Sequence, residues 1–301
     1  MKRETGAAVI MAILLMALVA SLAAALLWQQ QMWLRETDNM EHSVQATALA
    51  QAGADWAAFI LATSPRNEVD LLQPWAQRLP LLPMEEVQAG GFLQDEQGLF
   101  NLNNLVKQGK TDLHWQMRFQ RLLAELNLPL TLANTLADWL DADTIVQPGG
   151  AEDAVYLNHF PPYRAANHVL MDVSELRYVQ GFDAQTIARL RPFVSALPQQ
   201  TPINVNTAPP VVLLAMVDGL SPSEARTLVA QRDNQPFLAL TDFHQALPRL
   251  DINPDQQGLT VTSGYFMAAV TVHANRAQRT IWTLFERGSN AWPHIIWQKA
   301  S

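Results

Sequence analysis

An uncharged apolar stretch of about 22 residues, from Ala7 to Trp28, limits most strongly what this chain can fold into. Ser21 is its single hydroxyl-bearing residue, and the stretch holds neither Gly nor Pro. At about 1.5 Å of rise per residue, a helix of this length crosses a hydrocarbon core of roughly 30 Å. The sequence therefore predicts a transmembrane helix over residues 7–28 and a chain that is tethered to a membrane.

Charges on the two sides of the stretch predict its orientation. Lys2 and Arg3 precede it, whereas only Arg35 follows closely behind it. By the positive-inside tendency, the N-terminus stays cytoplasmic and the remaining ~270 residues are exported. We therefore expect a single-pass inner-membrane protein with a periplasmic C-terminal part.

A cleavable signal peptide and a plain signal anchor are the two ordinary explanations of such a stretch. The apolar region of a signal peptide has about 7–15 residues, but this one is longer and passes into Gln29–Gln31 and Trp33. A plain anchor does not require the Gly6 that lies between the polar leader and the apolar run. That order resembles a type IV prepilin leader, which implies cleavage by prepilin peptidase after Gly6 and a new N-terminus at Ala7.

One position departs from the usual prepilin pattern. Prepilin-type subunits usually carry Glu at the fifth mature position, and here that position is Met11. The departure either excludes the pilin interpretation or marks a special subunit.

The segment from Leu34 to about Leu61 has the apolar periodicity of an amphipathic helix. Together with the anchor it could form one helix of about 50 residues, and the alternative is two helices with a break near Gln29. Ser64-Pro65 should end this stem, because Pro lacks an N–H and disfavours helix in the residue before it.

The rest of the chain suggests a sheet interrupted by helices. Residues 90–103 are expected to form a hairpin with its turn at Glu96-Gln97-Gly98, after a loop-rich passage that contains Pro74, Pro80 and Pro83. Helical spacing recurs in the segments 115–126, 130–140, 173–179, 186–197 and 210–217. Strands are expected at 259–262, 265–273 and 280–285, with a turn at 275–278 between the last two.

This order predicts five segments. They are a leader over 1–6, a transmembrane helix over 7–28, a stem with the first strands over 29–105, an inserted helical domain over 106–254, and C-terminal strands over 255–301.

Net charge and cysteine content narrow the functional classes. The net charge of −8 disfavours nucleic acid as a bulk partner. The chain contains no Cys, so an exported domain must be stabilised by packing or by a bound metal ion instead of disulfides.

Four segments in order carry a family resemblance. They are Asp95–Asn103 (D-E-x-G-x-x-N-x-N), Asp138–Asp143, Gly150–Asp153 with Tyr156, and Ile203–Ala208. With the leader and stem they resemble the minor pseudopilin K family of type II secretion systems, over essentially the whole chain. That family also lacks the Glu after the cleavage site, so Met11 supports the resemblance.

The resemblance implies a fold, a place and partners. The fold is α+β and type IV pilin-like: a long N-terminal helix packed on an antiparallel sheet, with a large inserted all-α domain. The place is the tip of a short periplasmic pseudopilus, where the subunit nucleates assembly and supports export of folded proteins. The partners are minor pseudopilins I and J of the same system, with the secretin channel and exported substrates as further candidates.

A weak internal repeat suggests a competing function. Val179-Gln180-Gly181-Phe182 is echoed by Val217-Asp218-Gly219-Leu220, about 38 residues later, in a pattern that resembles a helix-hairpin-helix unit. The alternative is therefore a membrane-anchored DNA receptor of the competence type. Pro222 removes an amide that a phosphate grip would use, and residues 201–250 form no basic patch. We therefore favour a helical packing unit without nucleic acid as a partner.

An acidic cluster is the one candidate for site chemistry. It comprises Asp138, Asp141, Asp143, Glu152 and Asp153, with Gly149-Gly150 allowing a tight return between its two halves. Hard oxygen ligands on a flexible loop suit Ca²⁺, and the family resemblance also implies structural calcium in the insertion. A solvated acidic loop is the alternative.

Other site chemistry finds little support in the sequence. No His lies at zinc spacing and no Cys is present, so we do not expect a zinc site. Paired carboxylates also occur in hydrolases, but no G-x-S-x-G, H-E-x-x-H or P-loop motif accompanies them. We therefore do not expect an enzyme.

Overall fold

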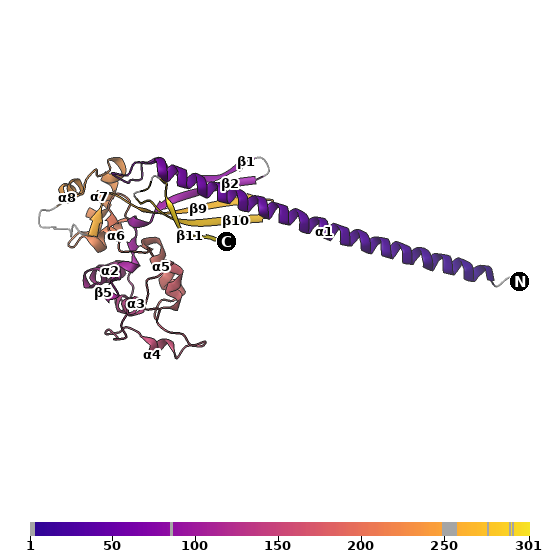
Figure 1. Cartoon of the computed structure of the whole chain (residues 1–301), viewed down its shortest axis with the longest axis horizontal. Helices are drawn as coiled ribbons and strands as arrows, with labels where there is room; N and C mark the ends of the chain where they lie inside the picture. Colours follow the sequence, from indigo (N-terminus) through magenta and orange to yellow (C-terminus); the bar gives the residue numbers. More distant parts are fainter. Residues whose placement is uncertain (1–3, 85–86, 249–257, 276, 289, 291) are drawn as a thin grey trace.

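The computed structural model describes residues 4–84, 87–248, 258–275, 277–288, 290 and 292–301. Helix α1 (Glu4–Thr63) is continuous over 60 residues, which is about 90 Å at the helical rise. The prediction of a single stem helix is thus confirmed, and the break near Gln29 is absent from this described helix. The helix ends just before Ser64-Pro65, as expected. Its N-terminal half projects away from the rest of the molecule (Figure 1).

The C-terminal half of α1 packs on a sheet through small residues. Its buried positions recur every three or four residues: Ala46, Ala50, Ala54, Ala57 and Leu61. They lie against strands β9 (Tyr265–Ala274) and β10 (Ala277–Glu286). At Gly53 a Cβ would come within 2.6 Å of Val270 Cγ1, so glycine permits the close approach of helix and sheet.

The sheet is antiparallel and has five strands in the order β1-β2-β9-β10-β11. The remaining members are β1 (Leu79–Met84), β2 (Val87–Asp95) and β11 (His294–Ala300). The predicted strands at 265–273 and 280–285 are confirmed as β9 and β10. Strands β1 and β11 were not expected from the sequence, since the prolines of β1 indicated a loop.

The predicted hairpin over residues 90–103 is wrong. Strand β2 ends at Asp95, and a 3-10 turn (η2, Glu96–Gly98) then carries the chain out of the sheet. The next strand, β3 (Phe100–Asn101), pairs in parallel with β6 (Val194–Ser195), whereas β2 pairs with β1 and β9. Strands do occur in both halves of this segment, but the pairing partner of β3 lies far away in the sequence.

Between β2 and β9 the chain forms a mainly helical segment. Its helices are α2 (Leu113–Glu125), α3 (Leu132–Leu140), α4 (Asp153–Tyr156), α5 (Ala184–Leu190), α6 (Pro210–Met216), α7 (Pro222–Asn234) and α8 (Leu240–Ala246). The segment also contains the 3-10 helices η3 (Leu102–Leu105), η4 (Val173–Tyr178) and η5 (Arg191–Phe193). A further 3-10 helix, η1 (Pro74–Ala76), lies before β1. Short two-residue strands complete the helical segment: β4 (Val106–Lys107), β5 (Lys110–Thr111), β7 (Ile203–Asn204) and β8 (Leu259–Thr260).

Most of the expected helices are present, with two differences. The helix predicted over 186–197 ends at Leu190, because Pro192 follows and the chain continues as 3-10 helix and then as β6. Helices α4, α7 and α8 were not among the predicted segments. The expected helical domain, residues 106–254, falls within this excursion from the sheet, and its residues 249–254 lie outside the described part of the chain.

The largest hydrophobic core belongs to the helical segment, not to the sheet. It gathers residues from β3 to Val261, just after β8, including Phe100, Phe119, Leu136, Leu213 and Phe243. Separate, smaller clusters hold α1 on the sheet. The helices gather around the end of the sheet that is far from the N-terminus (Figure 1).

Candidate metal centre

The acidic cluster sits where α3 ends and the chain turns back on itself. Asp138 lies on the last turn of α3, and Asp141 is the residue that caps its C-terminus. The chain returns at Glu152, which is the N-cap residue of the short helix α4. The two ends of one loop therefore bring carboxylates together, as the sequence predicted from Gly149-Gly150.

Three carboxylates meet at one point. Candidate ligand oxygens of Asp141, Asp143 and Glu152 all lie within 4.8 Å of one another. Asp141 and Glu152 are each only 3% exposed, whereas Asp143 is exposed. A mostly buried group of like charges is costly unless something neutralises it.

Several buried carboxylate oxygens in this cluster have no hydrogen-bond partner in the described part of the chain, which indicates the kind of ligand that would complete it. Asp141 Oδ1 and both carboxylate oxygens of Glu152 have no hydrogen-bond partner among the described residues. The other oxygen of Asp141, Oδ2, accepts a 2.9 Å hydrogen bond from Thr111 Oγ1. Three buried oxygens without partners, on two carboxylates of this convergent group, fit a hard cation, which binds carboxylate and carbonyl oxygens.

Asp138 lies beside this group and holds the loop. Its side chain is fully buried, and Oδ2 accepts a 3.1 Å hydrogen bond from the backbone N–H of Gln147. A Cβ at Gly150 would lie 1.9 Å from the same oxygen, so a larger residue there would displace either the loop or this carboxylate. We therefore assign Asp138 a positioning role next to the three converging carboxylates.

Asp153 points to other partners. Its Oδ1 accepts a 3.0 Å hydrogen bond from the backbone N–H of Ala165, and its Oδ2 lies 3.6 Å from Arg164 Nη1. The structure thus brings together three of the five predicted carboxylates, and places Asp138 beside them and Asp153 away from them.

The electrostatics of the cluster follow from burial and mutual repulsion. Burial first, and then the neighbouring carboxylates of Asp138 and Asp141, raise the pKa of Glu152 to about 7. Burial raises the pKa of Asp138 to about 6, although the N–H of Gln147 favours its charged form. Burial also raises the pKa of Asp141, against the hydrogen bond from Thr111. A bound cation would reverse these shifts.

The predicted processing residues lie at the far end of α1. Gly6, Ala7 and Met11 are exposed, and Met11 is 72% exposed. The helix from Gly6 onward is long and apolar enough to cross a membrane. The transmembrane prediction for residues 7–28 thus agrees with a single uninterrupted helix.

The asparagines of the motifs have a role that sequence reasoning missed. Asn101, Asn103, Asn104 and Asn206 are almost fully buried and bond distant backbone groups. Asn103 Nδ2 donates to the carbonyls of Leu170 and Leu197, while its Oδ1 accepts from Leu170 N–H, all at 2.8 Å. The side-chain amides of these asparagines bond backbone groups of other segments at places where no strand pairing satisfies them. The asparagine motifs therefore hold the fold together and do not form a binding site. Their regular spacing beside apolar residues was the available signal.

The two repeat units share a turn geometry. Gly181, between η4 and α5, has φ +86°, and Gly219, between α6 and α7, has φ +76°. Each following helix is capped from within the chain: Asp183 accepts from Thr186 N–H, and Ser221 accepts from Glu224 N–H. These side chains therefore occupy backbone amides that a phosphate grip would need. The first cap, Asp183, is itself acidic, and the second, Ser221, is paired with the acidic Glu224.

Comparison with known proteins gives a consistent result. Two family models described as "Type II secretion system (T2SS), protein K" match residues 98–199 and 203–262. Type II secretion system protein K of Pseudomonas aeruginosa is 35% identical, over 95% of this chain and 90% of that protein. The protein K of Klebsiella pneumoniae is 32% identical, over 92% and 90%, respectively.

A solved structure shares the fold. GspK in the GspK–GspI–GspJ complex of the enterotoxigenic Escherichia coli type 2 secretion system superposes with a TM-score of 0.73. The match has 28% sequence identity and covers 89% of this chain and 98% of that chain. The pilin-like α+β architecture is thereby confirmed, and the DNA-receptor alternative gives way to a secretion component. The chain belongs to the type II secretion system protein K family and is a minor pseudopilin, a structural component of that system and not an enzyme.

Proposed function

We propose that this minor pseudopilin occupies the tip of the pseudopilus, nucleates its assembly and so supports export of folded proteins across the outer membrane. Two features of the chain carry the proposal together. Met11 lies near the start of the stem helix, and a large helical segment lies at the opposite end of the molecule. Each feature restricts what can stack on one side of this subunit.

The first restriction is electrostatic. After cleavage at Gly6, Ala7 would carry a positively charged amine at the start of an apolar helix. Burying that charge in a bundle of stems is costly without an anionic partner. A Glu at the fifth mature position of one subunit can supply that partner to the subunit above it. Met11 cannot, so this subunit is suited to a position with no subunit above.

The second restriction is steric. Helices α2 to α8 surround the end of the sheet farthest from the membrane-spanning half of α1 (Figure 1). A further subunit stacked on this end would meet the inserted helices instead of a free pilin surface. Charge and shape thus favour the same terminal position.

The partners follow from the family and from the leader. A related protein K was solved together with GspI and GspJ, so we propose minor pseudopilins I and J as partners of this chain. Prepilin peptidase would process the leader at Gly6, and the secretin and exported substrates are candidates for contact at the tip. The apolar helix would anchor the chain in the inner membrane, with a cytoplasmic N-terminus and a periplasmic C-terminal domain.

Processing and tip position can be tested in sequence. The intact mass and N-terminal peptide are measured for protein extracted from membranes with and without prepilin peptidase. A methylated chain that starts at Ala7 only with the peptidase supports the pseudopilin mechanism. Residues 1–6 retained in both samples would contradict processing and favour a plain anchored protein.

Assembly is tested next by co-purification with I and J. Met11→Glu should leave recovery of the complex within about twofold of wild type, because no subunit above depends on this position. Deleting residues 7–28 should abolish the complex in membranes, since the apolar stem is removed. An intact complex after that deletion would refute the assembly mechanism.

We also propose that calcium binds the acidic cluster and has a structural role. Asp141, Asp143 and Glu152 would supply carboxylate oxygens, and backbone carbonyls and water would complete the six to eight ligands that Ca²⁺ takes. The three buried, unpartnered oxygens support this assignment. The ion would fix the loop between α3 and α4 in a chain without disulfides.

A further inference from the structure

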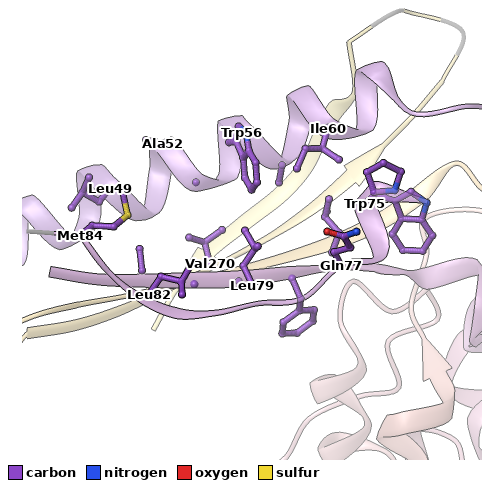
Figure 2. A pocket seen from close by; sticks show the side chains of 18 of the residues that line it. Leu49, Ala52, Trp56, Ile60, Trp75, Gln77, Leu79, Leu82, Met84 and Val270 are labelled. Atoms are coloured by element: carbon purple, nitrogen blue, oxygen red, sulfur yellow. The ribbon is translucent and has the colours of Figure 1, made fainter. Parts of the chain in front are cut away.

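A polar pocket lies on the helical segment. It encloses about 390 Å³ and is lined by residues of β4, the first turns of α2 and the loop 200–202. It differs in character from the apolar groove between α1 and β1, which Trp56 and Leu82 line (Figure 2). Its volume is near the lower end of the range of about 300–1,000 Å³ for ligand pockets. The polar pocket therefore suits one or two polar side chains and not a folded domain.

The polar pocket has an excess of positive charge. Three side chains that can carry a positive charge line it: Lys107, His114 and Arg118. Among the described residues of its wall, Asp112 is the single carboxylate, and its Oδ1 accepts the backbone N–H groups of His114 and Trp115. That carboxylate is thus engaged at the start of α2. In a chain of net charge −8, a local excess of cations selects an anionic ligand by charge complementarity.

The local sequence explains why these cations lie together. The turn between β4 and β5, at Gln108-Gly109, has positive φ at both residues, as a tight two-residue hairpin turn requires. It returns the chain directly after Lys107, and α2 begins shortly behind β5. His114 and Arg118 are four positions apart and so lie on one face of α2. The hairpin and the helix therefore contribute cations to the same pocket.

The wall formed by residues 200–202 is held by a motif asparagine. Asn104 Oδ1 accepts a 2.9 Å hydrogen bond from the backbone N–H of Thr201, and Asn104 Nδ2 donates a 2.8 Å bond to the Thr201 carbonyl. Gln200 Nε2 donates a 2.9 Å bond to the Asn104 carbonyl. Because these bonds fix the wall in advance, a ligand loses little free energy in ordering it.

Arg118 is the buried cation of the polar pocket. It is only 5% exposed, and its guanidinium lies 4.8 Å from the ring centroid of Trp115. A Cβ at Gly258 would come within 2.5 Å of Arg118 Nη1, so glycine lets the backbone pass close to the guanidinium. Burial lowers the local dielectric constant and strengthens the attraction of this charge for an anion. The planar guanidinium matches the geometry of a carboxylate.

Position and overall charge exclude two phosphate-bearing classes of ligand. Helix α2 belongs to the helices that gather at the end of the sheet far from the N-terminus, which we call the distal end (Figure 1). The stem helix continues from Trp28 to Thr63, roughly 50 Å at about 1.5 Å per residue, so lipid headgroups of the anchoring membrane do not reach this pocket. Nucleic acid needs a row of cations along its backbone, whereas these cations are confined to one pocket of an acidic chain.

We propose that the polar pocket binds a carboxylate of an acidic segment on a protein that meets the distal end of this subunit. Arg118 receives the carboxylate, while the exposed Lys107 and His114 attract the acidic residues beside it. The inference rests on the proposed tip position, which leaves the distal end open to a protein other than a stacked subunit. It adds the surface and the chemistry of that contact.

The first test measures binding of an acidic probe. The full-length chain in a neutral detergent is titrated into a fluorescent oligoglutamate peptide with capped ends, and anisotropy reports binding at low ionic strength. We expect saturable binding with a Kd below about 1 mM that weakens as salt is added. Absence of saturable binding, or equal binding of an oligoglutamine peptide, would refute recognition of a carboxylate. Displacement of the peptide by inorganic phosphate at an equal concentration would overturn the proposal in favour of a small anion.

The second test uses variants matched in charge. Lys107 and Arg226 are both exposed, but Lys107 lines the polar pocket, whereas Arg226 lies on α7 and does not line it. Lys107→Glu should weaken oligoglutamate binding at least about tenfold, because it reverses a charge at the pocket, and Lys107→Arg should retain the affinity within about threefold. Arg226→Glu changes the net charge as much as Lys107→Glu does and should leave the Kd within about twofold of wild type.

The outcome of the variants decides between the pocket and the net charge. All three substitutions are at exposed positions, so each variant should retain the wild-type circular dichroism spectrum. Equal weakening by Lys107→Glu and Arg226→Glu would show that net charge, and not the polar pocket, attracts the peptide.

The last test identifies the partner segment in secreting cells. A photo-crosslinking amino acid replaces His114 in the full-length chain, and the adducts are sequenced by mass spectrometry. The expected adducts lie within or beside runs of Asp and Glu on another protein, and adducts to segments without carboxylates would overturn the proposal. Failure of the wild-type chain to recover I and J would refute the proposed tip position. Loss of the preference for oligoglutamate over oligoglutamine would refute the pocket assignment alone, so the two proposals fail separately.

Discussion

The carboxylate of Asp95 accepts a 3.0 Å hydrogen bond from the side-chain amide of Asn204, a residue 109 positions away in the chain. The same Oδ2 accepts hydrogen bonds of 2.6 Å from the hydroxyls of Thr207 and Ser263. Asp95 ends β2, Asn204 lies in β7, and Ser263 precedes β9. One buried carboxylate therefore fastens the point where the chain leaves the sheet to the point where it returns.

Removing this carboxylate should destabilise the protein strongly. Asp95→Ala removes the acceptor of the Asn204 amide, of the Thr207 and Ser263 hydroxyls and of the Gln97 N–H, which we expect to lower the free energy of unfolding by about 3 kcal/mol or more. The measurement is urea unfolding of the periplasmic part in the wild type and the variant. Asn234→Ala is the control, because that exposed amide bonds the nearby Ala230 carbonyl on its own helix, and it should change stability by less than about 0.5 kcal/mol.

The neighbouring Glu96 should make stability depend on pH. Burial first, and then the carboxylates of Asp95 and Asp172, raise the pKa of Glu96 to about 8. Since the folded pKa exceeds the unfolded value of 4.5, this group favours folding most below about pH 4.5 and loses that contribution as pH rises through 8. Glu96→Gln retains the neutral form, so its advantage over wild type should grow between pH 5 and 8.

Thermal unfolding across pH 4 to 9 measures this difference. We expect the two proteins to be similar at pH 4 and the variant to be more stable by about 2 kcal/mol or more at pH 8. A difference between the two proteins that stays constant over the whole range would show that Glu96 ionises normally in the folded state.

Gly150 tests the packing of the acidic loop. A methyl group there would overlap Asp138 Oδ2, at 1.9 Å, so either the loop or the carboxylate must move. Gly150→Ala should lower the free energy of unfolding by about 1–3 kcal/mol and weaken calcium binding, which is measured by calorimetry. At Gly288 nothing lies within 4 Å of an added methyl group, so Gly288→Ala should leave both quantities nearly unchanged. Equal effects of the two substitutions would argue against a packing constraint at the loop.

Calcium affinity should fall as the medium is acidified. The ligands must be deprotonated, and the pKa of Glu152 in the absence of metal is about 7. At pH 6 about nine-tenths of this group would hold a proton, so the apparent Kd should be about tenfold weaker than at pH 8. Calorimetric titrations of the metal-free protein at both values provide the measurement.

Two carboxyl variants identify the ligands in the same titrations. Glu152→Gln should weaken binding at least about tenfold and remove most of the pH dependence, since it deletes an ionised ligand. Asp153→Asn should change affinity little, because Asp153 bonds Ala165 and Arg164 outside the cluster. A larger loss from Asp153→Asn than from Glu152→Gln would exclude the proposed ligand set.

Chelation completes the calcium tests. A structural ion that binds only the folded state stabilises it by about 2.7 kcal/mol when free calcium is 100 times the Kd. Adding a chelator to the wild type should therefore lower the unfolding midpoint, whereas Glu152→Gln should unfold at the same temperature with or without it. If the unfolding midpoint of the wild type were the same with and without the chelator, the structural role of calcium would be refuted.

Local features predicted the stem and the last two long strands. The apolar run, a stripe of apolar residues in the stem, and the Pro after Ser64 together predicted one long helix and its end. The stripe expected from the sequence comprised Ala48, Leu49, Ala52, Trp56, Phe59 and Ile60. The structure instead buries the neighbouring face of Ala46, Ala50, Ala54 and Leu61 on the sheet, so the helix was predicted correctly but its buried face was wrong. Residues 265–273 and 280–285 alternate clearly, and they form β9 and β10. These elements could be predicted because periodicity and helix termination are encoded by neighbouring residues.

Pairing between distant segments could not be predicted in the same way. Phe100 and Asn101 form a short strand beside Val194 and Ser195, so a plausible local hairpin was replaced by a parallel pair across the helical segment. Strand β1 forms despite Pro80 and Pro83, because an outer strand can do without some of its N–H groups.

The acidic loop shows, at a single site, the same difference between what the sequence predicts and what the tertiary structure decides. The sequence by itself determined which carboxylates are close along the chain and that Gly149-Gly150 permits a return. Only the tertiary structure decided that Asp141, Asp143 and Glu152 converge, that Asp138 instead bonds Gln147, and that Asp153 turns to Ala165. The physical reason is that burial and hydrogen bonding depend on segments brought together by the core of the helical segment, whereas residue spacing describes only one segment at a time.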